Sequence, residues 1–354
     1  MQPRCSLVPK EEGNNPMKAL VNHGARQWRV QEWAEPTLRP GDVLVEVAAC
    51  GICGTDLHAY KGLDVGWPLP GIPGHEIAGR VLAWGSEVRG FSAGDRVAVQ
   101  PLLYCGLCED CRAGRVNLCS HLEFVGGSLT GGYAERTAVP ARGLFKLPDS
   151  LDLSQAAMAE TLSTPVHAFN QNVSGLLRSV AVMGAGTQGL LSLQLALLAG
   201  ARAVAITDVV PRRLAVAEEL GATLVINARE QDPVESILAM ADGRGVDLAI
   251  EAAGKAISRQ QALRVLRPGG MAIFIALGTE PTPIDFMSLV PRELQIRGTQ
   301  CYNDDDFALA IELLASHAVQ VEPLLTRLPL ADGREAFEML VTDPGQAIKV
   351  VLEP

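Results

Sequence analysis

The sequence predicts an α/β protein of two domains, in which a doubly wound parallel-sheet domain is inserted into a mostly β domain. A Gly-x-Gly-x-x-Gly turn at 184–189 separates a β-branched strand from an apolar helix. Strand and helix patterns then alternate as far as residue 277, whereas β segments punctuated by Gly and Pro precede residue 165. The length of 354 residues, 48% of them hydrophobic, supports two separate cores.

The composition excludes several classes of protein. A net charge of −10, from 30 basic and 40 acidic side chains, argues against a nucleic-acid module such as a zinc ribbon, because affinity for phosphates depends on Lys and Arg. The first 16 residues lack the apolar core of a signal peptide, and the longest apolar stretch, 190–201, is shorter than the ~20 residues of a membrane span. We therefore expect a cytoplasmic protein with no membrane or nucleic-acid partner, whose cysteines remain thiols.

Two short motifs in the first domain offer mixed metal ligands. The segment 50–58 reads Cys-Gly-Ile-Cys-Gly-Thr-Asp-Leu-His and follows a predicted strand at 42–49, and Gly-His-Glu at 74–76 precedes a predicted strand at 77–83. Cys, His and Glu all bind zinc, and a mixed set that leaves one position open is typical of a catalytic site. Taken alone, these motifs also fit small buried cysteines and a polar pair at a helix start.

Four cysteines follow a third predicted strand at 96–100. The segment 105–119 has the spacing Cys-x2-Cys-x2-Cys-x7-Cys, and short Cys-x2-Cys turns bring successive sulfurs to one point, as a tetrahedral structural zinc requires. An iron–sulfur cluster is an alternative, although ferredoxin-type runs end in Cys-Pro, and a set of free thiols or a disulfide pair is another. The predicted ligands of this structural zinc lobe are Cys105, Cys108, Cys111 and Cys119.

The glycine-rich turn predicts a dinucleotide site. Gly184 permits the tight turn, Gly186 lets the backbone approach a pyrophosphate, and Gly189 allows the helix to pack closely against the strand. The first turn of that helix offers unpaired N–H groups to the phosphate.

Asp208 bears on the choice of cofactor. It ends a predicted strand at 203–208, 19 residues after the last glycine of the turn. A carboxylate there accepts hydrogen bonds from ribose hydroxyls and repels a 2′-phosphate, so NAD is favoured over NADP, although Arg212 and Arg213 follow closely. The alternative role of Asp208 is a helix cap before Pro211.

The inserted domain is predicted to span 165–294, and the two parts of the first domain to span 1–164 and 295–354. Residues 304–354 are expected to rejoin the first domain. Alternation of strands with helices predicts a parallel sheet. After residue 208 the expected helices are 211–220, 233–241 and 258–266, and the expected strands are 223–226, 246–251 and 271–277.

The motifs together resemble the zinc-containing medium-chain dehydrogenases over nearly the whole chain from Met17. The resemblance is strongest to the polyol branch, with its sorbitol, 2,3-butanediol, threonine and sugar-alcohol-phosphate dehydrogenases, because Glu76 follows His75 directly and Glu160 stands where the ethanol-oxidising branch has a cysteine. It implies a GroES-like catalytic domain and a Rossmann NAD-binding domain. Residues 1–16 have no counterpart and are expected to be a disordered extension.

The resemblance also implies site residues. The catalytic zinc would be held by Cys53, His75 and one or both of Glu76 and Glu160, and would act as a Lewis acid that stabilises the substrate alkoxide. Thr55 and His58 would relay the proton to solvent, with capping of a helix as their alternative role, and Asp56 would accept the second ring N–H of His75. The cofactor would contact Gly184, Gly186, Thr187, Gln188, Gly189, Asp208 and Arg213.

The expected enzyme therefore carries two zinc ions per subunit and moves hydride from a secondary alcohol, of a polyol, vicinal diol or sugar alcohol, to NAD. Alternatives are an L-threonine 3-dehydrogenase-like or sugar-alcohol-phosphate dehydrogenase, or a non-catalytic zinc and dinucleotide sensor or scaffold. By analogy with the polyol branch we expect a homo-oligomer, with a tetramer favoured over a dimer. Trp67 and Tyr60 are candidates for lining the substrate pocket because they lie near the ligands in the sequence.

Overall fold

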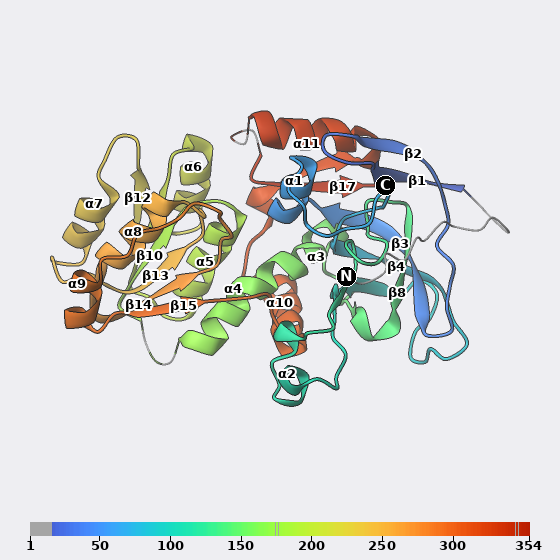
Figure 1. Cartoon of the computed structure of the whole chain (residues 1–354), viewed down its shortest axis with the longest axis horizontal. Coiled ribbons are helices and arrows are strands. Elements are labelled where there is room, and N and C mark those ends of the chain that lie inside the picture. Colours follow the sequence, from blue (N-terminus) through green and yellow to red (C-terminus); the bar gives the residue numbers. More distant parts are fainter. Residues whose placement is uncertain (1–15, 174, 176, 344, 346) are drawn as a thin grey trace.

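A computed structural model describes residues 16–173, 175, 177–343, 345 and 347–354, and these form two domains side by side along the long axis (Figure 1). The inserted domain, coloured yellow to orange, makes up one end of the molecule. The predicted N-terminal extension lies outside the described residues except for Pro16, which already begins strand β1.

The inserted domain is built on a six-stranded parallel sheet. Its strand order is β12-β11-β10-β13-β14-β15, which is the order of a doubly wound dinucleotide-binding sheet. The strands are β10 (Ser179–Met183), β11 (Ala203–Asp208), β12 (Leu224–Asn227), β13 (Val246–Glu251), β14 (Leu266–Phe274) and β15 (Gln295–Gly298).

Alternate side chains of the central strand β10 enter two different cores, which shows that helices cover both faces of the sheet. Val180 and Val182 pack in one apolar cluster with Leu190 of α5, whereas Ala181 and Met183 belong to another. The second cluster includes residues of α7 and α8. The helices of this domain are α5 (Thr187–Leu198), α6 (Pro211–Glu219), α7 (Pro233–Met240), α8 (Ala256–Arg264) and the short α9 (Phe286–Leu289).

The other domain contains a seven-stranded sheet with the path β16-β17-β3-β4-β5-β9, and β8 pairs with β3 off this path. The end of the chain returns to it, because Leu352 in β17 pairs with Cys50 in β3, as predicted for residues 304–354. The strands are β3 (Asp42–Gly51), β4 (Glu76–Trp84), β5 (Arg96–Val99), β8 (Arg136–Pro140), β9 (Leu144–Lys146), β16 (Leu325–Pro329) and β17 (Lys349–Glu353).

Among the described helices, none has the length and apolar character needed to cross a lipid bilayer.

Smaller elements complete the fold. The remaining strands are β1 (Pro16–Asn22), β2 (Trp28–Ala34), β6 (Leu102–Leu103) and β7 (Glu123–Phe124). The remaining α-helices are α1 (Gly54–Tyr60), α2 (Glu109–Arg112), α3 (Leu153–Ala156), α4 (Met158–Asn172), α10 (Asp304–Ala315) and α11 (Gly333–Thr342). The 3₁₀ turns are η1 (Val116–Leu118), η2 (Ala141–Gly143), η3 (Val290–Arg292), η4 (Glu322–Leu324) and η5 (Leu330–Asp332).

Both predicted domain boundaries differ from the ends of the observed elements. The parallel sheet extends past residue 294, because Gln295 in β15 pairs with Met271 in β14. At the other boundary, Pro165 lies inside α4 rather than before a new domain. A proline usually marks a break because it removes one helical N–H. Here the packing of α4 against α5 and α10 keeps the helix continuous.

Candidate active site and metal centres

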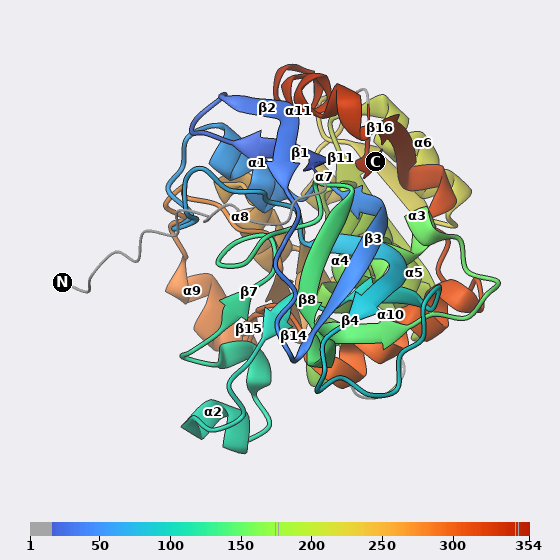
Figure 2. The same ribbon diagram turned by 90° about the vertical axis from the view of Figure 1, so that its right-hand side faces the viewer.

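The four cysteines of the predicted lobe converge on one point. Their sulfurs all lie within 4.8 Å of one another, with separations of 3.5 Å for Cys105–Cys119, 3.9 Å for Cys108–Cys119 and 4.0 Å for Cys105–Cys111. Tetrahedral zinc with Zn–S bonds of about 2.3 Å holds its sulfurs ~3.8 Å apart, so the thiol set fits a single zinc ion. Figure 2 shows the lobe, which includes α2, projecting at one edge of the molecule.

Backbone N–H groups in this lobe donate hydrogen bonds to cysteine sulfurs. The amides of Leu107 and Cys108 both donate to the Sγ of Cys105 at 3.4 Å. Such bonds, first of all from the Cys111 amide, lower the pKa of Cys108 to about 6. Burial and the Cys108 thiol instead raise the pKa of Cys111 to about 12. Zinc binds thiolates, so a set in which some thiols ionise readily suits this ion.

A second group of metal-ligand atoms lies where strand β3 ends and strand β4 begins. Ligand atoms of Cys53, His75 and Glu76 all lie within 4.8 Å of one another. Cys53 stands at the start of α1, just after β3, and Glu76 begins β4, opposite Gly51 in the strand register. A Cβ at Gly51 would collide with the Glu76 carboxylate, so a side chain there would displace this group.

Asp56 caps the start of α1 and lies beside the His75 ring without a hydrogen bond to it. One carboxylate oxygen accepts hydrogen bonds from the Cys53 amide at 2.9 Å and from the Tyr133 hydroxyl at 2.7 Å. The other oxygen faces His75 Nδ1 at 3.8 Å, and neither of these two buried atoms has a hydrogen-bond partner. The negative charge and the two unpaired atoms fit a bound cation. If a metal bound His75 through its other ring nitrogen, the ring would be oriented so that its Nδ1–H could donate to Asp56.

The pKa of His75 reflects the negative charge of the groups around it. Burial alone would lower the pKa of His75, yet the charges of Asp56 and Cys53 outweigh burial and raise it well above its usual value. Only 3% of His75 is exposed, and Glu76 beside it is fully buried. A zinc ion would supply the positive charge that these ligand groups otherwise obtain from a proton.

Lys349 is a site residue that the sequence analysis missed. It begins β17 and is 3% exposed, and its ammonium group forms an ion pair with the Glu76 carboxylate and donates to the Ile52 carbonyl at 3.0 Å. Burial opposes the charge on Lys349, but Glu76 outweighs burial and raises its pKa. The available signal was a single lysine within the apolar run 347–352.

Glu160 lies near this site but outside the group of three. It is in the first turn of α4, and its Oε1 accepts a hydrogen bond of 2.8 Å from the hydroxyl of Tyr302. Burial raises the pKa of Glu160, while His75 acts to lower it and Glu76 to raise it. The sequence analysis assigned no role to Tyr302.

Thr55 and His58 lie on α1, three residues apart and therefore on one side of the helix. The Thr55 hydroxyl is 3.8 Å from the sulfur of Cys53. At the start of α1, the amide of Cys53, the residue before the helix, donates to the Asp56 carboxylate. The His58 side chain is half-buried and lies in the last turn of the helix.

The glycine-rich turn has the geometry that its three predicted roles require. Gly184 has a φ of +103°, which side chains rarely adopt, and a Cβ at Gly189 would collide with the carbonyl oxygen of Gly184. A Cβ at Gly186 would meet nothing within 4 Å, so open space faces this residue at the start of α5. The turn therefore fits close approach of a pyrophosphate to the helix N-terminus.

The two side chains that follow Gly186 contact protein groups. The Thr187 hydroxyl donates to the Ile348 carbonyl at 3.1 Å, and the Gln188 amide donates to the Thr161 carbonyl at 3.1 Å. Both side chains thus tie α5 to the rest of the chain. Their contribution to cofactor binding would come from the backbone at the start of the helix.

Asp208 stands at the end of β11 beside the same turn. It accepts hydrogen bonds from the amides of Ala185 at 2.7 Å and Val210 at 3.0 Å, and Arg213 lies 3.8 Å from its Oδ2. The bond to Val210 shows that Asp208 also orders the start of α6, as its alternative role predicted. The carboxylate and the guanidinium next to it offer opposite charges to the ribose end of a dinucleotide.

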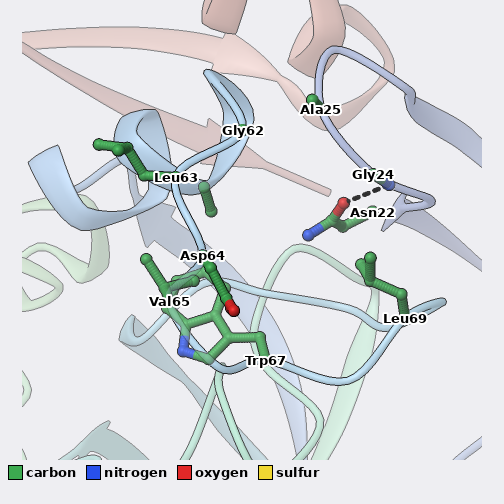
Figure 3. Close-up of a pocket in the computed structure, with 10 residues that line it drawn as sticks. Asn22, Gly24, Ala25, Gly62, Leu63, Asp64, Val65, Trp67 and Leu69 are labelled. Carbon is green, nitrogen blue, oxygen red and sulfur yellow. Dashed lines mark hydrogen bonds between the residues drawn. The ribbon is translucent and has the colours of Figure 1, made fainter.

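A separate surface pocket of about 340 Å³ lies between the β1–β2 turn and the loop after α1 (Figure 3). The buried amide of Asn22 and the carboxylate of Asp64 point into it from opposite sides, above Trp67. Trp67 thus lines a pocket, although none of the predicted zinc ligands does so here. The prediction for Tyr60 is wrong: it is fully buried and donates to Glu338 at 2.6 Å.

Comparison with known proteins places this chain in a family. The alcohol dehydrogenase GroES-like domain matches residues 39–149, and the zinc-binding dehydrogenase domain matches residues 189–316. The chain is 36% identical to the sorbitol dehydrogenase of Bacillus subtilis over 96% of its own length and 97% of that protein. It belongs to the zinc-binding medium-chain alcohol dehydrogenase family, which confirms the predicted family and fold class.

Two solved structures extend the comparison. The structure of 2R,3R-butanediol dehydrogenase from Bacillus subtilis superposes with a TM-score of 0.88 at 30% identity, covering 96% of this chain and 99% of that one. A zinc-binding dehydrogenase from Sinorhizobium meliloti 1021, bound to NADP, gives a TM-score of 0.90 at 32% identity, covering 96% and 100%. The prediction of a dehydrogenase that uses zinc and a dinucleotide is therefore confirmed.

Proposed function

We propose that this chain oxidises a secondary alcohol of a polyol, vicinal diol or sugar alcohol and transfers the hydride to NAD. The observation that carries the proposal is the convergence of Cys53, His75 and Glu76 in a negative, buried site. The relatives named above for sorbitol and butanediol support the substrate class. A dehydrogenase for L-threonine or for a sugar-alcohol phosphate is the alternative within the family.

Cys53 and His75 would hold the catalytic zinc, with Glu76 as third ligand because its carboxylate lies within the same group of atoms. Glu160, which Tyr302 holds nearby, would be the second carboxylate of the site. Zinc bound here would lower the pKa of an alcohol, as it lowers that of water to ~7. Cys105, Cys108, Cys111 and Cys119 would hold a second, structural zinc ion.

The proton of the alcohol would leave along one side of α1. Thr55 stands beside Cys53, so its hydroxyl is placed to accept a proton from an alcohol next to that ligand. His58 lies one turn further along the helix and is half-exposed, so its imidazole can pass a proton to water. Removal of the proton there leaves the carbinol C–H as the hydride donor.

For the cofactor we propose NAD. The support is the Asp208 carboxylate, 8% exposed, which would accept hydrogen bonds from the ribose hydroxyls. Arg213 beside it, and the NADP in the related structure, favour NADP instead. Comparing NAD with NADP in Asp208→Asn measures which charge dominates: the NAD preference should fall if the carboxylate sets it.

We further propose a homo-oligomer, a tetramer rather than a dimer, in a reducing cytoplasm. Apolar side chains support association, because Phe286, Met287 and Val290 are more than half exposed close to the exposed edge strand β15. The cysteines that the structure describes are all free thiols, which suits a reducing compartment.

The test is reduction of NAD and NADP across vicinal diols, hexitols, L-threonine and sugar-alcohol phosphates. We expect turnover with at least one diol or hexitol, and a loss of more than ~10³-fold in kcat/KM in Cys53→Ser, because the thiolate holds the metal. Cys50→Ser is the matched control, since Cys50 is a buried neighbour outside the ligand group, and it should stay active. Turnover that survives Cys53→Ser would refute the mechanism, and absence of turnover with every alcohol would favour the sensor or scaffold.

A further inference from the structure

We propose that the four-cysteine lobe helps to set the geometry of the catalytic centre, through a segment at 300–304 in which Tyr302 is a positioning residue for Glu160. This inference rests on the proposed function, because it gives Glu160 a place beside the catalytic zinc. It adds a role for the lobe besides local stability.

The lobe holds the segment 300–304 from two points. The Tyr104 hydroxyl, next to the first cysteine of the lobe, donates to Asp304 Oδ2 at 2.7 Å. The Asn117 amide, two residues before the last cysteine, donates to the Gln300 carbonyl at 2.7 Å. These contacts reach both ends of the segment. Its path therefore depends on how the lobe is folded, and the lobe itself depends on its four converging thiols.

Tyr302 lies between those two points and faces the catalytic centre. It is 1% exposed, and its hydroxyl donates to Glu160 Oε1 at 2.8 Å. The preceding residue, Cys301, has a φ of +48°, a left-handed backbone that non-glycine residues rarely adopt. Contacts on either side must hold this turn in place, and the bonds from Tyr104 and Asn117 are placed to do so.

A second set of contacts locks the segment onto the helix that carries Glu160. Asp306, in the first turn of α10, accepts from the Asn170 amide at 2.8 Å and lies 2.6 Å from His167 Nδ1, and both partners belong to α4. Asp306 also accepts from the amide of Asn303, directly after Tyr302. Tyr302 and Glu160 thus approach each other from two elements that are fixed to one another.

The Asn117 side chain joins the two sets of contacts. Its amide nitrogen lies 3.4 Å from His167 Nε2 as well as 2.7 Å from the Gln300 carbonyl. One residue of the lobe therefore touches both the segment that carries Tyr302 and the helix that carries Glu160. Loss of the lobe contacts should free the segment, and Tyr302 would then no longer fix one oxygen of Glu160.

Two variants isolate the two steps of this coupling. Tyr302→Phe removes only the hydroxyl that holds Glu160. The double variant Tyr104→Phe/Asn117→Ser removes the contacts of the lobe with Asp304, Gln300 and His167. Arg115→Gln is the matched control, because Arg115 bonds Asp110 within the lobe at 2.7 Å and lies outside these contacts. All variants keep the four cysteines, and measured metal content verifies that the lobe stays loaded.

Two readouts do not depend on turnover. Hydrogen exchange of the amides at 300–304 should accelerate about tenfold or more in the double variant, because the hydrogen bonds to the Gln300 carbonyl and to the Asp304 carboxylate are lost. It should stay unchanged in the control. With Co²⁺ in the catalytic site, the visible absorption band should shift in Tyr302→Phe and in the same direction in the double variant.

An unshifted cobalt band in Tyr302→Phe overturns the positioning role of Tyr302. An unchanged exchange rate in the double variant, or an equal change in Arg115→Gln, overturns the role of the lobe. A wild-type protein that binds metal only at the four cysteines refutes the proposed function instead, and the exchange rates still decide whether the lobe holds the segment.

Discussion

Replacing Lys349 with methionine should destabilise the protein strongly. Lys349 and Glu76 form a buried ion pair, 3% and 0% exposed, so removal of the lysine leaves a carboxylate in the core without its counter-charge. Breaking such a pair costs about 3–5 kcal/mol, whereas neutralising both partners removes most of the cost. We therefore expect Lys349→Met to lower the free energy of unfolding by ~3–5 kcal/mol in metal-free protein, and Lys349→Met/Glu76→Gln to recover at least half of it.

The assay is urea unfolding of the metal-free and zinc-loaded protein, monitored by circular dichroism. The loss should be smaller with zinc, because the ion also balances the charge of Glu76. Arg327→Met is the control, since its partner Glu322 has a side chain 57% exposed, and such pairs contribute about 0–1 kcal/mol. A loss below ~1 kcal/mol in Lys349→Met, or a double variant as unstable as the single one, would refute the reasoning.

Two further predictions concern the glycine turn and a surface ion pair. Gly186→Ala should leave the melting temperature within ~2 °C, because its Cβ would face open space in the protein, but it should weaken cofactor binding about tenfold or more by calorimetry, because a pyrophosphate is expected in that space. Gly189→Ala should instead lower the melting temperature, because its Cβ would collide with the Gly184 carbonyl. Equal effects of the two glycine changes on the melting temperature would contradict this prediction. The second prediction concerns the ion pair of Arg327 with Glu322. The Arg327 guanidinium lowers the pKa of Glu322 from 4.5 to about 2, so the pair stabilises the fold above pH 4.5 and loses this effect as the pH falls toward 2. Glu322→Gln should therefore be less stable than wild type at pH 6, by less than ~1 kcal/mol, and should match it near pH 2 in thermal melts; a difference that is constant with pH would contradict the assignment.

Motifs whose residues lie close together in the sequence were the easiest to interpret. The four cysteines fall within 15 residues, so short turns bring their sulfurs together whatever the rest of the chain does. The turn at 184–189 is also local, because the collision at Gly189 and the positive φ of Gly184 arise within six residues. Alternating strand and helix patterns likewise predicted the parallel sheet, since each βαβ step has one favoured hand and position.

The elements at the two predicted domain boundaries depend on packing, which the local sequence does not show. Pro165 has the local character of a break, but α4 continues through it where α5 and α10 pack against it. The strand β15 contains a charged residue, and all four of its residues are exposed; it joins the parallel sheet through backbone pairing with β14. Backbone hydrogen bonds leave little trace in the pattern of side chains. The predicted boundary after residue 294 therefore assigned this strand to the other domain.

By itself the sequence determined the family, the two-domain α/β fold, and which residues are candidates for zinc and dinucleotide binding. Only the tertiary structure showed which groups hold those candidates. Lys349 meets Glu76 from 273 residues away, and Tyr302 meets Glu160 from 142 residues away. A buried charged group requires a polar or charged partner, and that partner can come from any part of the chain. The pairing of β17 with β3 brings Lys349 to Glu76, and the packing of α10 on α4 brings Tyr302 to Glu160.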